Sequence, residues 1–267
     1  MYDFEYRKPA SVAEAAAILA GDAEAKALAG GMTFIPVMKQ RLAKPSVVVD
    51  LAGLGLTGIR REGDAIVIGA MTPHGRVADS ADVKSAFPAL AYLADNIGDR
   101  QVRERGTIGG SLANNDPSAC YPAAALATGA TIRTNRREIA AEDYFLGMFT
   151  TALEQDELIT EVSLPIPRAA HYEKFVNPAS RYPMVAVFVA RMPGGTRVAV
   201  TGAGNNGVFR HREMEQALDR EFSPEAIRDI KTPEEQMNSD IHASAPYRAH
   251  LVGVMARRAV AAINGRG

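Results

Sequence analysis

A pair of adjacent glycines that occurs twice restricts the fold more than any other feature of the sequence. The first pair, Gly30-Gly31, follows a short apolar segment and precedes a segment of helical character, 33–41. The second pair, Gly109-Gly110, lies in a glycine-rich stretch further along the chain. Because glycine has no Cβ, a turn built on it can approach a bulky anion, and its consecutive amides can bind phosphate oxygens. Two such turns could hold a pyrophosphate from two sides.

Neither glycine pair fits a standard nucleotide-binding motif. No Gly-Lys-Ser/Thr follows either pair, so neither is a P-loop, and neither has the G-x-G-x-x-G spacing of a Rossmann nicotinamide site. The hydroxyl groups of Thr33, Thr107 and Ser111 could add hydrogen-bond donors. Taken singly, each pair favours a tight turn, because glycine's commonest role is conformational.

The first two thirds of the chain alternate between helix and strand signals. Ser11 and Glu14 form a capping box before an alanine-rich helix that extends to about residue 20. The pattern then predicts a strand at 26–29, a helix at 33–41 and a strand at 46–50. Further on we expect a hairpin over 56–69, helices at 73–79, 87–97 and 122–128, a hairpin over 130–139 and a strand at 157–164.

The double proline of Pro165-Ile-Pro167 marks the predicted domain boundary. Beyond it the order of elements changes to a run of strands followed by a run of helices. The strands are expected at 172–176, 185–191 and 197–201, and the helices at 210–219, 224–230 and 244–264. Such an order is typical of a small α+β domain.

Charge, cysteine and histidine usage exclude several classes of function. A net charge of −1 gives no reason to expect a nucleic-acid partner. The single cysteine, Cys120, cannot by itself hold an iron–sulfur cluster or a zinc–thiolate site. The five histidines show no HExxH spacing, and no apolar run approaches the ~20 residues of a membrane span. Without a signal-peptide pattern at its N-terminus, the chain is expected to be cytoplasmic.

A series of short motifs in a fixed order extends over nearly the whole chain. They are Phe4-Glu-Tyr-Arg-Lys-Pro9, Ala29-Gly-Gly-Met-Thr33, Asp50-Leu51, Ile68-Gly-Ala-Met-Thr72, Gly106-Thr-Ile-Gly-Gly-Ser-Leu-Ala113, Asp116-Pro117, Asp143-Tyr-Phe-Leu-Gly147, Asp156-Glu-Leu-Ile-Thr-Glu-Val162, Ser244-Ala-Pro-Tyr-Arg248 and Arg257-Arg258. Together they resemble the FAD-binding subunits of the xanthine dehydrogenase and carbon monoxide dehydrogenase family of molybdenum hydroxylases.

The resemblance implies an α+β fold with two parts. Residues 1–167 would form a two-subdomain FAD-binding domain of the vanillyl-alcohol oxidase (PCMH) type, with subdomains at about 1–52 and 53–167. Residues 168–267 would form a small α+β C-terminal domain. No metal site and no catalytic acid or base is expected in this chain.

The family also implies which residues contact the cofactor, with both glycine loops on the FAD pyrophosphate. Lys174 corresponds to a family lysine near the isoalloxazine ring, where a cation could stabilise the reduced flavin; otherwise it is a solvated strand lysine. The expected cofactor-binding residues are Ala29, Gly30, Gly31, Met32, Thr33, Phe34, Thr107, Gly109, Gly110, Ser111, Ala113, Asp116 and Lys174.

One position departs from the family pattern. Members usually carry Asp or Glu after Asp-Pro-x-x, where it binds ribityl or sugar hydroxyls, and here that position is Cys120, a poor acceptor. FAD would then bind less tightly, or Asn114, Asn115 or Asp116 would replace the missing carboxylate. Cys120 itself is expected to be a small buried apolar residue rather than a redox group.

The resemblance implies an electron-transfer subunit in a complex of three kinds of chain. A large subunit would oxidise the substrate at a molybdopterin cofactor, and a small subunit would carry two [2Fe–2S] clusters. The present chain would pass their electrons through FAD to NAD⁺, oxygen, quinone or another acceptor, within a dimer of heterotrimers. The alternatives are a stand-alone FAD oxidase and a flavin-free scaffold subunit. The substrate would be set by the large subunit and not by this sequence.

Overall fold

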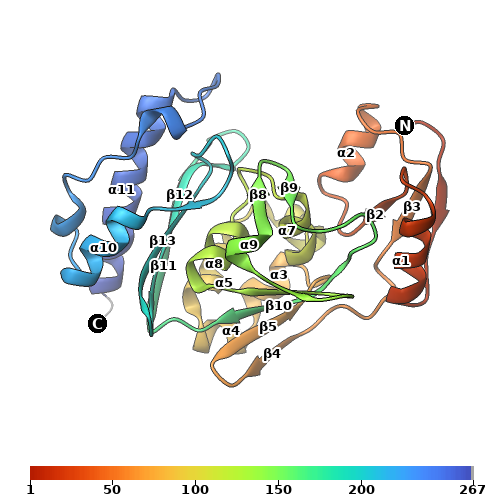
Figure 1. The fold of residues 1–267 in the computed structure, drawn as a ribbon, viewed down its shortest axis with the longest axis horizontal. Coiled ribbons are helices and arrows are strands. Elements are labelled where there is room, and N and C mark those ends of the chain that lie inside the picture. Colours follow the sequence, from red (N-terminus) through yellow and green to blue (C-terminus); the bar gives the residue numbers. More distant parts are fainter. Residues whose placement is uncertain (266–267) are drawn as a thin grey trace.

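The computed structural model describes residues 1–265, which form three main sheets with helices between and outside them (Figure 1). A three-stranded sheet has the order β1-β3-β2, a five-stranded sheet the order β4-β5-β10-β6-β7, and a four-stranded sheet the order β11-β12-β13-β14. A two-stranded hairpin, β8-β9, is separate from these. The N-terminal sheet and the C-terminal sheet lie at opposite ends of the long axis, with the five-stranded sheet between them (Figure 1).

The N-terminal unit has the predicted order of helix, strand, helix and strand. Its elements are β1 (Glu5–Arg7), α1 (Val12–Gly21), β2 (Lys26–Leu28), α2 (Phe34–Lys39) and β3 (Val47–Asp50), and all three strands are parallel. The predicted cap of α1 is confirmed, because the Ser11 hydroxyl accepts a hydrogen bond from the Glu14 amide. The Glu14 carboxylate in turn accepts one from the Ala10 amide.

The five-stranded sheet is antiparallel and carries the central core on one face. It comprises β4 (Ile59–Glu62), β5 (Ala65–Gly69), β6 (Thr131–Thr134), β7 (Glu138–Ala140) and β10 (Ile159–Pro165). Alternate side chains, including Ile66, Ile68 and Val162, are fully buried against helices that follow β5. These helices are α3 (His74–Asp79), α4 (Ala81–Ala86), α5 (Pro88–Asp95), α6 (Arg100–Arg105), α7 (Ile108–Asn114), α8 (Tyr121–Thr128) and α9 (Ala141–Tyr144).

The C-terminal sheet buries both of its faces. Its strands are β11 (Ala169–Val176), β12 (Pro183–Met192), β13 (Gly195–Thr201) and β14 (Phe209–Arg210). One face, with Val187 and Val198, packs under α10 (Arg212–Arg220) and α11 (Ala245–Asn264). The other face, with Phe188 and Ala199, belongs to the same core as the central sheet. The alternation of β12 side chains therefore joins the C-terminal unit firmly to the rest of the chain.

Several elements differ from the sequence-based expectation. The strands β1 and β14, the helices α4, α6, α7 and α9, and the hairpin of β8 (Phe145–Gly147) and β9 (Thr150–Thr151) were not predicted. Helix α6 has the sequence RQVRER and no buried residue, so it carries no apolar periodicity. The α-helix expected at 224–230 is wrong, because only a 3₁₀ turn forms at Glu225–Ile227, with Ile227 as its only buried residue.

A buried ion pair fixes the β6–β7 hairpin to the start of β10. Arg137 donates two hydrogen bonds to the Glu157 carboxylate, and the Thr134 hydroxyl donates a third. The Glu157 side chain has no exposed area, whereas that of Arg137 is 46% exposed. The Arg137 guanidinium lowers the pKa of Glu157 from its ordinary value of 4.5 to about 2. Since Glu157 also lines the cavity described below, this pair supports one of the cavity walls.

Replacing Glu157 by Gln should lower the free energy of unfolding by about 2 kcal/mol, less than the ~3–5 kcal/mol of a fully buried pair because Arg137 is half-exposed. The native pKa is depressed, so the pair stabilises the fold fully above pH 4.5, and this contribution is lost as the pH falls toward 2. The free energy of unfolding, measured with urea across this pH range, should depend less on pH for the variant than for the wild type. The exposed Glu138→Gln is the control, and an equal effect there would contradict the assignment.

Candidate cofactor-binding site

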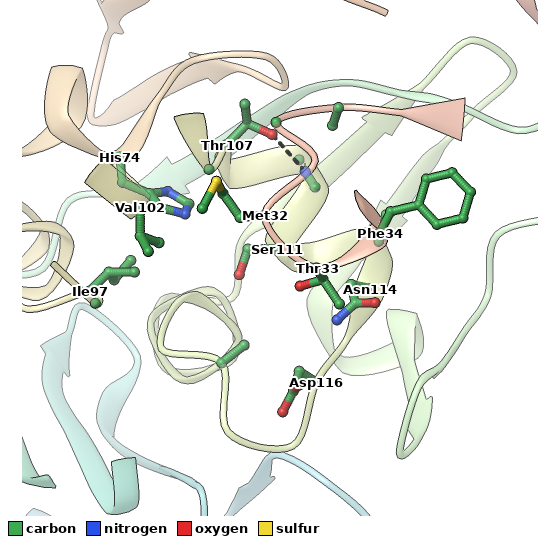
Figure 2. Close-up of a pocket in the computed structure, with 18 of the residues that line it drawn as sticks. Met32, Thr33, Phe34, His74, Ile97, Val102, Thr107, Ser111, Asn114 and Asp116 are labelled. Atoms are coloured by element: carbon green, nitrogen blue, oxygen red, sulfur yellow. Dashed lines mark hydrogen bonds between the residues drawn. The ribbon is translucent and has the colours of Figure 1, made fainter. Parts of the chain in front are cut away.

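A cavity of about 690 Å³ lies where the N-terminal unit, the central helices and the C-terminal sheet meet (Figure 2). Both glycine pairs form part of its wall. All of the residues expected at a cofactor site line it, although they come from widely separated parts of the chain. They are Ala29, Gly30, Gly31, Met32, Thr33, Phe34, Thr107, Gly109, Gly110, Ser111, Ala113, Asp116 and Lys174.

The two glycine loops touch each other through their backbones. A Cβ added at Gly30 would lie 2.6 Å from the carbonyl carbon of Arg105, would overlap its oxygen, and would lie 3.0 Å from Cα of Gly106. The next residue, Gly31, has φ +74°, which strongly favours glycine. The first glycine pair is therefore required by the close approach of the N-terminal unit to the end of α6.

The first loop presents backbone amides that are free to bind a ligand. Within residues 1–265, the amides of residues 30–34 donate no hydrogen bond to the protein. The first amides that do so after this loop are those of Ile35, which donates to the Gly31 carbonyl, and Val37, which donates to the Thr33 carbonyl. Consecutive free amides beside an open cavity can bind the oxygens of an anion such as a phosphate.

The second loop does not offer a similar row of amides without partners in the protein. The Ile108 amide donates to the Thr72 carbonyl, and the Gly109 amide donates to the Ala70 carbonyl at 2.8 Å. The Gly110 amide donates to the Thr107 hydroxyl at 3.1 Å, which caps α7 (Figure 2). The glycines of this loop are required by close packing, because a Cβ at Gly109 would lie 2.6 Å from that of Ala70 and a Cβ at Gly110 would lie 3.2 Å from that of Ala29.

A polar region of the wall follows the second loop. Asn114 and Asp116 line the cavity, and the Asp116 carboxylate also accepts a hydrogen bond from the Ser118 amide. Asn115 cannot replace the family carboxylate, because its side-chain amide donates to the carbonyls of Gly147 and Thr150. Cys120 lines the cavity and is 5% exposed. Of the three candidate residues, Asn114 and Asp116 therefore lie at the cavity, and the Asn115 side-chain amide is bonded elsewhere.

Lys174 reaches the cavity wall from β11. Its ammonium group donates a hydrogen bond of 2.6 Å to the carbonyl oxygen of Asn96, at the end of α5. Lys174 is therefore not a solvated strand lysine. Its contact also fixes Ile97 and Gly98, the next residues of the cavity wall, against the C-terminal sheet.

His74 is a lining residue that the sequence patterns did not indicate. It is 5% exposed, and its ring lies 5.2 Å from that of Tyr121. Burial, helped by the Arg103 guanidinium, lowers the pKa of His74 from 6.5 to about 4, so the imidazole is neutral at pH 7. An isolated histidine outside any metal-ligand spacing gave no signal in the sequence.

Other kinds of site are not found in the part of the chain that is described. Residues 1–265 contain no group of three or more His, Cys, Asp or Glu side chains that could hold a metal ion. The same residues include no helix that is long and apolar enough to cross a membrane.

Replacing Gly30 by Ala should destabilise the fold by about 3 kcal/mol, because the added methyl group forces the backbones of the two loops apart. Gly21→Ala is a matched control, since a Cβ there meets no atom within 4 Å. Urea unfolding of both variants measures the difference. If the Gly30→Ala and Gly21→Ala variants unfolded at the same urea concentration, the described contact between the loops would be contradicted.

Comparisons with known proteins agree over the whole chain. Residues 2–167 match the family described as the FAD binding domain in molybdopterin dehydrogenase. The nicotine 6-hydroxylase medium subunit of Paenarthrobacter nicotinovorans is 34% identical over 98% of this chain and 97% of its own length. The carbon monoxide dehydrogenase medium chain of Afipia carboxidovorans is 36% identical over 96% and 95%.

The similarity extends to a solved structure. The reconstituted CO dehydrogenase from Oligotropha carboxidovorans matches with a TM-score of 0.91 and 34% sequence identity over 100% of this chain and 99% of the matched chain. The chain therefore belongs to the family of FAD-binding medium subunits of molybdenum hydroxylases of the CO dehydrogenase and xanthine dehydrogenase type.

Proposed function

We propose that this chain binds FAD in the cavity between its two glycine loops and transfers electrons from the [2Fe–2S] clusters of a partner subunit to an external acceptor. The observation that carries the proposal is the row of amides at residues 30–34 that bond no acceptor within the protein, on a loop that lines the same cavity as the second glycine loop. This arrangement suits an elongated dianion flanked by two ring systems, as in FAD.

The residues present fit this cofactor in three respects. The free amides provide donors for the pyrophosphate without a lysine-containing phosphate motif. Ser111, Asn114 and Asp116 supply polar groups for ribityl or ribose hydroxyls. The volume of about 690 Å³ lies within the range of roughly 300–1,000 Å³ for small-molecule and cofactor sites.

The chemistry divides between the cofactor and the chain. Bound FAD would supply the electron-carrying ring, and the protein would bind it, orient it and limit its contact with water. Met32, Ile97 and Val102 provide an apolar portion of the wall. Lys174 places a positive charge at the wall, where it favours added negative charge on the bound cofactor. No side chain of this chain is assigned as a catalytic acid or base.

The proposed partners follow from what this chain lacks and from what its relatives are. One cysteine cannot hold a [2Fe–2S] cluster, so the clusters would belong to a small subunit and the molybdopterin to a large subunit. Relatives named as medium subunits or chains support such a complex, which we propose to be a dimer of heterotrimers. The free amides argue against a flavin-free scaffold.

The proposed domain organisation places the boundary at Pro165-Ile-Pro167. A FAD-binding domain of the vanillyl-alcohol oxidase type would comprise subdomains at about 1–52 and 53–167, followed by the C-terminal domain. In support, the central sheet ends with β10 at Pro165 and the C-terminal sheet begins with β11 at Ala169.

Purified full-length chain should be yellow, with the absorption bands of an oxidised flavin and FAD rather than FMN in the supernatant after denaturation. The physical reason is that free amides for two phosphates favour the dinucleotide. A chain that is colourless and also fails to take up added FAD would refute FAD binding by the isolated subunit.

Lys174→Gln should lower the midpoint potential of the bound flavin, because it removes a positive charge that favours the reduced form. We expect a shift of roughly 30 mV, equivalent to about 1.4 kcal/mol for a two-electron couple. Redox titration of the FAD-loaded chain measures it, with Lys84→Gln as the control because Lys84 lies on α4, outside the cavity. An unchanged or raised potential would leave Lys174 with only its structural contact to Asn96.

A further inference from the structure

His74 is held in the cavity wall by contacts that do not use its ring nitrogens. Its backbone amide donates to the Gly106 carbonyl at 2.9 Å, and its ring packs against Tyr121. A Cβ at Gly106 would lie 2.6 Å from Nε2 of His74, so the glycine leaves the space that the imidazole occupies. Figure 2 shows the ring extending from the wall toward Met32.

Neither ring nitrogen of His74 forms a hydrogen bond with any of residues 1–265. Nδ1 is fully buried without a partner, in a side chain whose residue is only 5% exposed. A buried polar group that lacks a hydrogen bond costs roughly 1–3 kcal/mol, and native structures seldom leave one unused. Nε2 also has no hydrogen-bond partner among the described residues but is not one of the fully buried atoms, so it is the ring nitrogen that a ligand in the cavity can reach.

The surroundings of His74 indicate what kind of ligand atom this would be. Its neighbours along the cavity wall include Met32, Ile97 and Val102, which are apolar and suit the faces of a flat ring (Figure 2). The free amides that suit phosphate belong to residues 30–34, and the polar groups that suit hydroxyls are Asn114 and Asp116. A neutral imidazole offers one donor and one acceptor, as does the edge of a heteroaromatic ring.

We infer that His74 is a cofactor-binding residue, whose imidazole hydrogen-bonds the nitrogen- and oxygen-bearing edge of one of the two ring systems of the bound dinucleotide. This inference rests on the proposed function, because it assigns a further residue to the same FAD site. Adenine and isoalloxazine share the required chemistry, and the experiment distinguishes them. His74 would select for a ring with such an edge, whereas the amides of the first glycine loop would hold the phosphates common to many nucleotides.

The test uses the full chain stripped of cofactor and titrated with FAD at pH 7, with binding followed by flavin fluorescence. His74→Phe keeps a flat ring and removes both nitrogens, and should weaken FAD binding roughly ten-fold. His74→Gln places an amide near the position of Nε2 and His74→Asn places one near that of Nδ1. One of these two should recover most of the lost affinity, and the one that does identifies the nitrogen that binds.

His171→Phe is the matched control. His171 is also 5% exposed with a buried, unpartnered Nδ1, but it stacks on Tyr92 and does not line the cavity. The affinity of the His171→Phe variant for FAD should lie within about two-fold of that of the wild type. Thermal unfolding of each stripped variant separates a loss of folding from a loss of binding, and the Gln and Asn variants keep the test valid if the Phe variant is unstable.

Competition with ADP and with FMN identifies the ring. If His74→Phe weakens ADP but not FMN, the imidazole binds adenine; the reverse result, with a shifted flavin spectrum, assigns it to isoalloxazine. Equal FAD affinity of all three His74 variants and His171→Phe would overturn the inference while leaving the proposed function intact. Failure of the wild-type chain itself to bind FAD would overturn both.

Discussion

The backbone contact between Gly30 and the Arg105–Gly106 peptide is the constraint on which the rest of the site depends. It brings a loop between β2 and α2 against a loop between α6 and α7, although one belongs to the parallel N-terminal sheet and the other to the helices of the central unit. A side chain at this point would separate the two units. The cavity is the space that remains beside this contact, and its wall therefore depends on the absence of a single Cβ.

The two glycine pairs perform different physical roles in spite of their similar sequences. The first leaves its amides without protein partners, and we propose that these amides are the hydrogen-bond donors to the cofactor. The second satisfies its own amides through Thr107 and the Ala70 carbonyl, so it provides shape and helix capping. The C-terminal sheet completes the enclosure, because Lys174 on β11 reaches the wall and bonds Asn96. Both faces of this sheet are buried in hydrophobic cores, so the part of the cavity wall that it forms is fixed to the rest of the protein.

Sequence patterns predicted the elements with a strong apolar periodicity, and the family resemblance implied the residues that gather at the cavity. The order of elements in the N-terminal unit and the capping role of Ser11 could be read from local patterns. Helix α6 was missed because RQVRER has no apolar stripe, and the segment at 224–230 was overestimated because Ile227 alone is buried. The two loops differ in whether their amides form hydrogen bonds within the protein. These bonds are tertiary contacts, and the spacing of residues in the sequence does not predict them.

The role of His74 could not be predicted from the sequence either. A histidine that neither binds a metal nor pairs with a carboxylate leaves no trace in a single sequence, and its importance appears only when its nitrogens are found unpartnered at a cavity wall. Of the three residues expected to substitute for a carboxylate at Cys120, Asn114 and Asp116 line the cavity, whereas the Asn115 side chain donates to the β8–β9 hairpin. The glycine pairs pointed to a nucleotide and the family resemblance implied which residues hold it, whereas the contacts that distinguish these residues appear only in three dimensions.

Binding of FAD by the first glycine loop can be tested by amide hydrogen exchange of the full chain, with and without FAD. We expect rapid exchange at residues 30–34 in the stripped chain, because these amides bond no acceptor within the protein, and strong protection when the cofactor phosphates accept from them. The amides of Gly109 and Gly110, already bonded within the protein, should change much less. Protection at the second loop without protection at the first would contradict the proposed division of roles, and no protection at either would contradict a dinucleotide site between them.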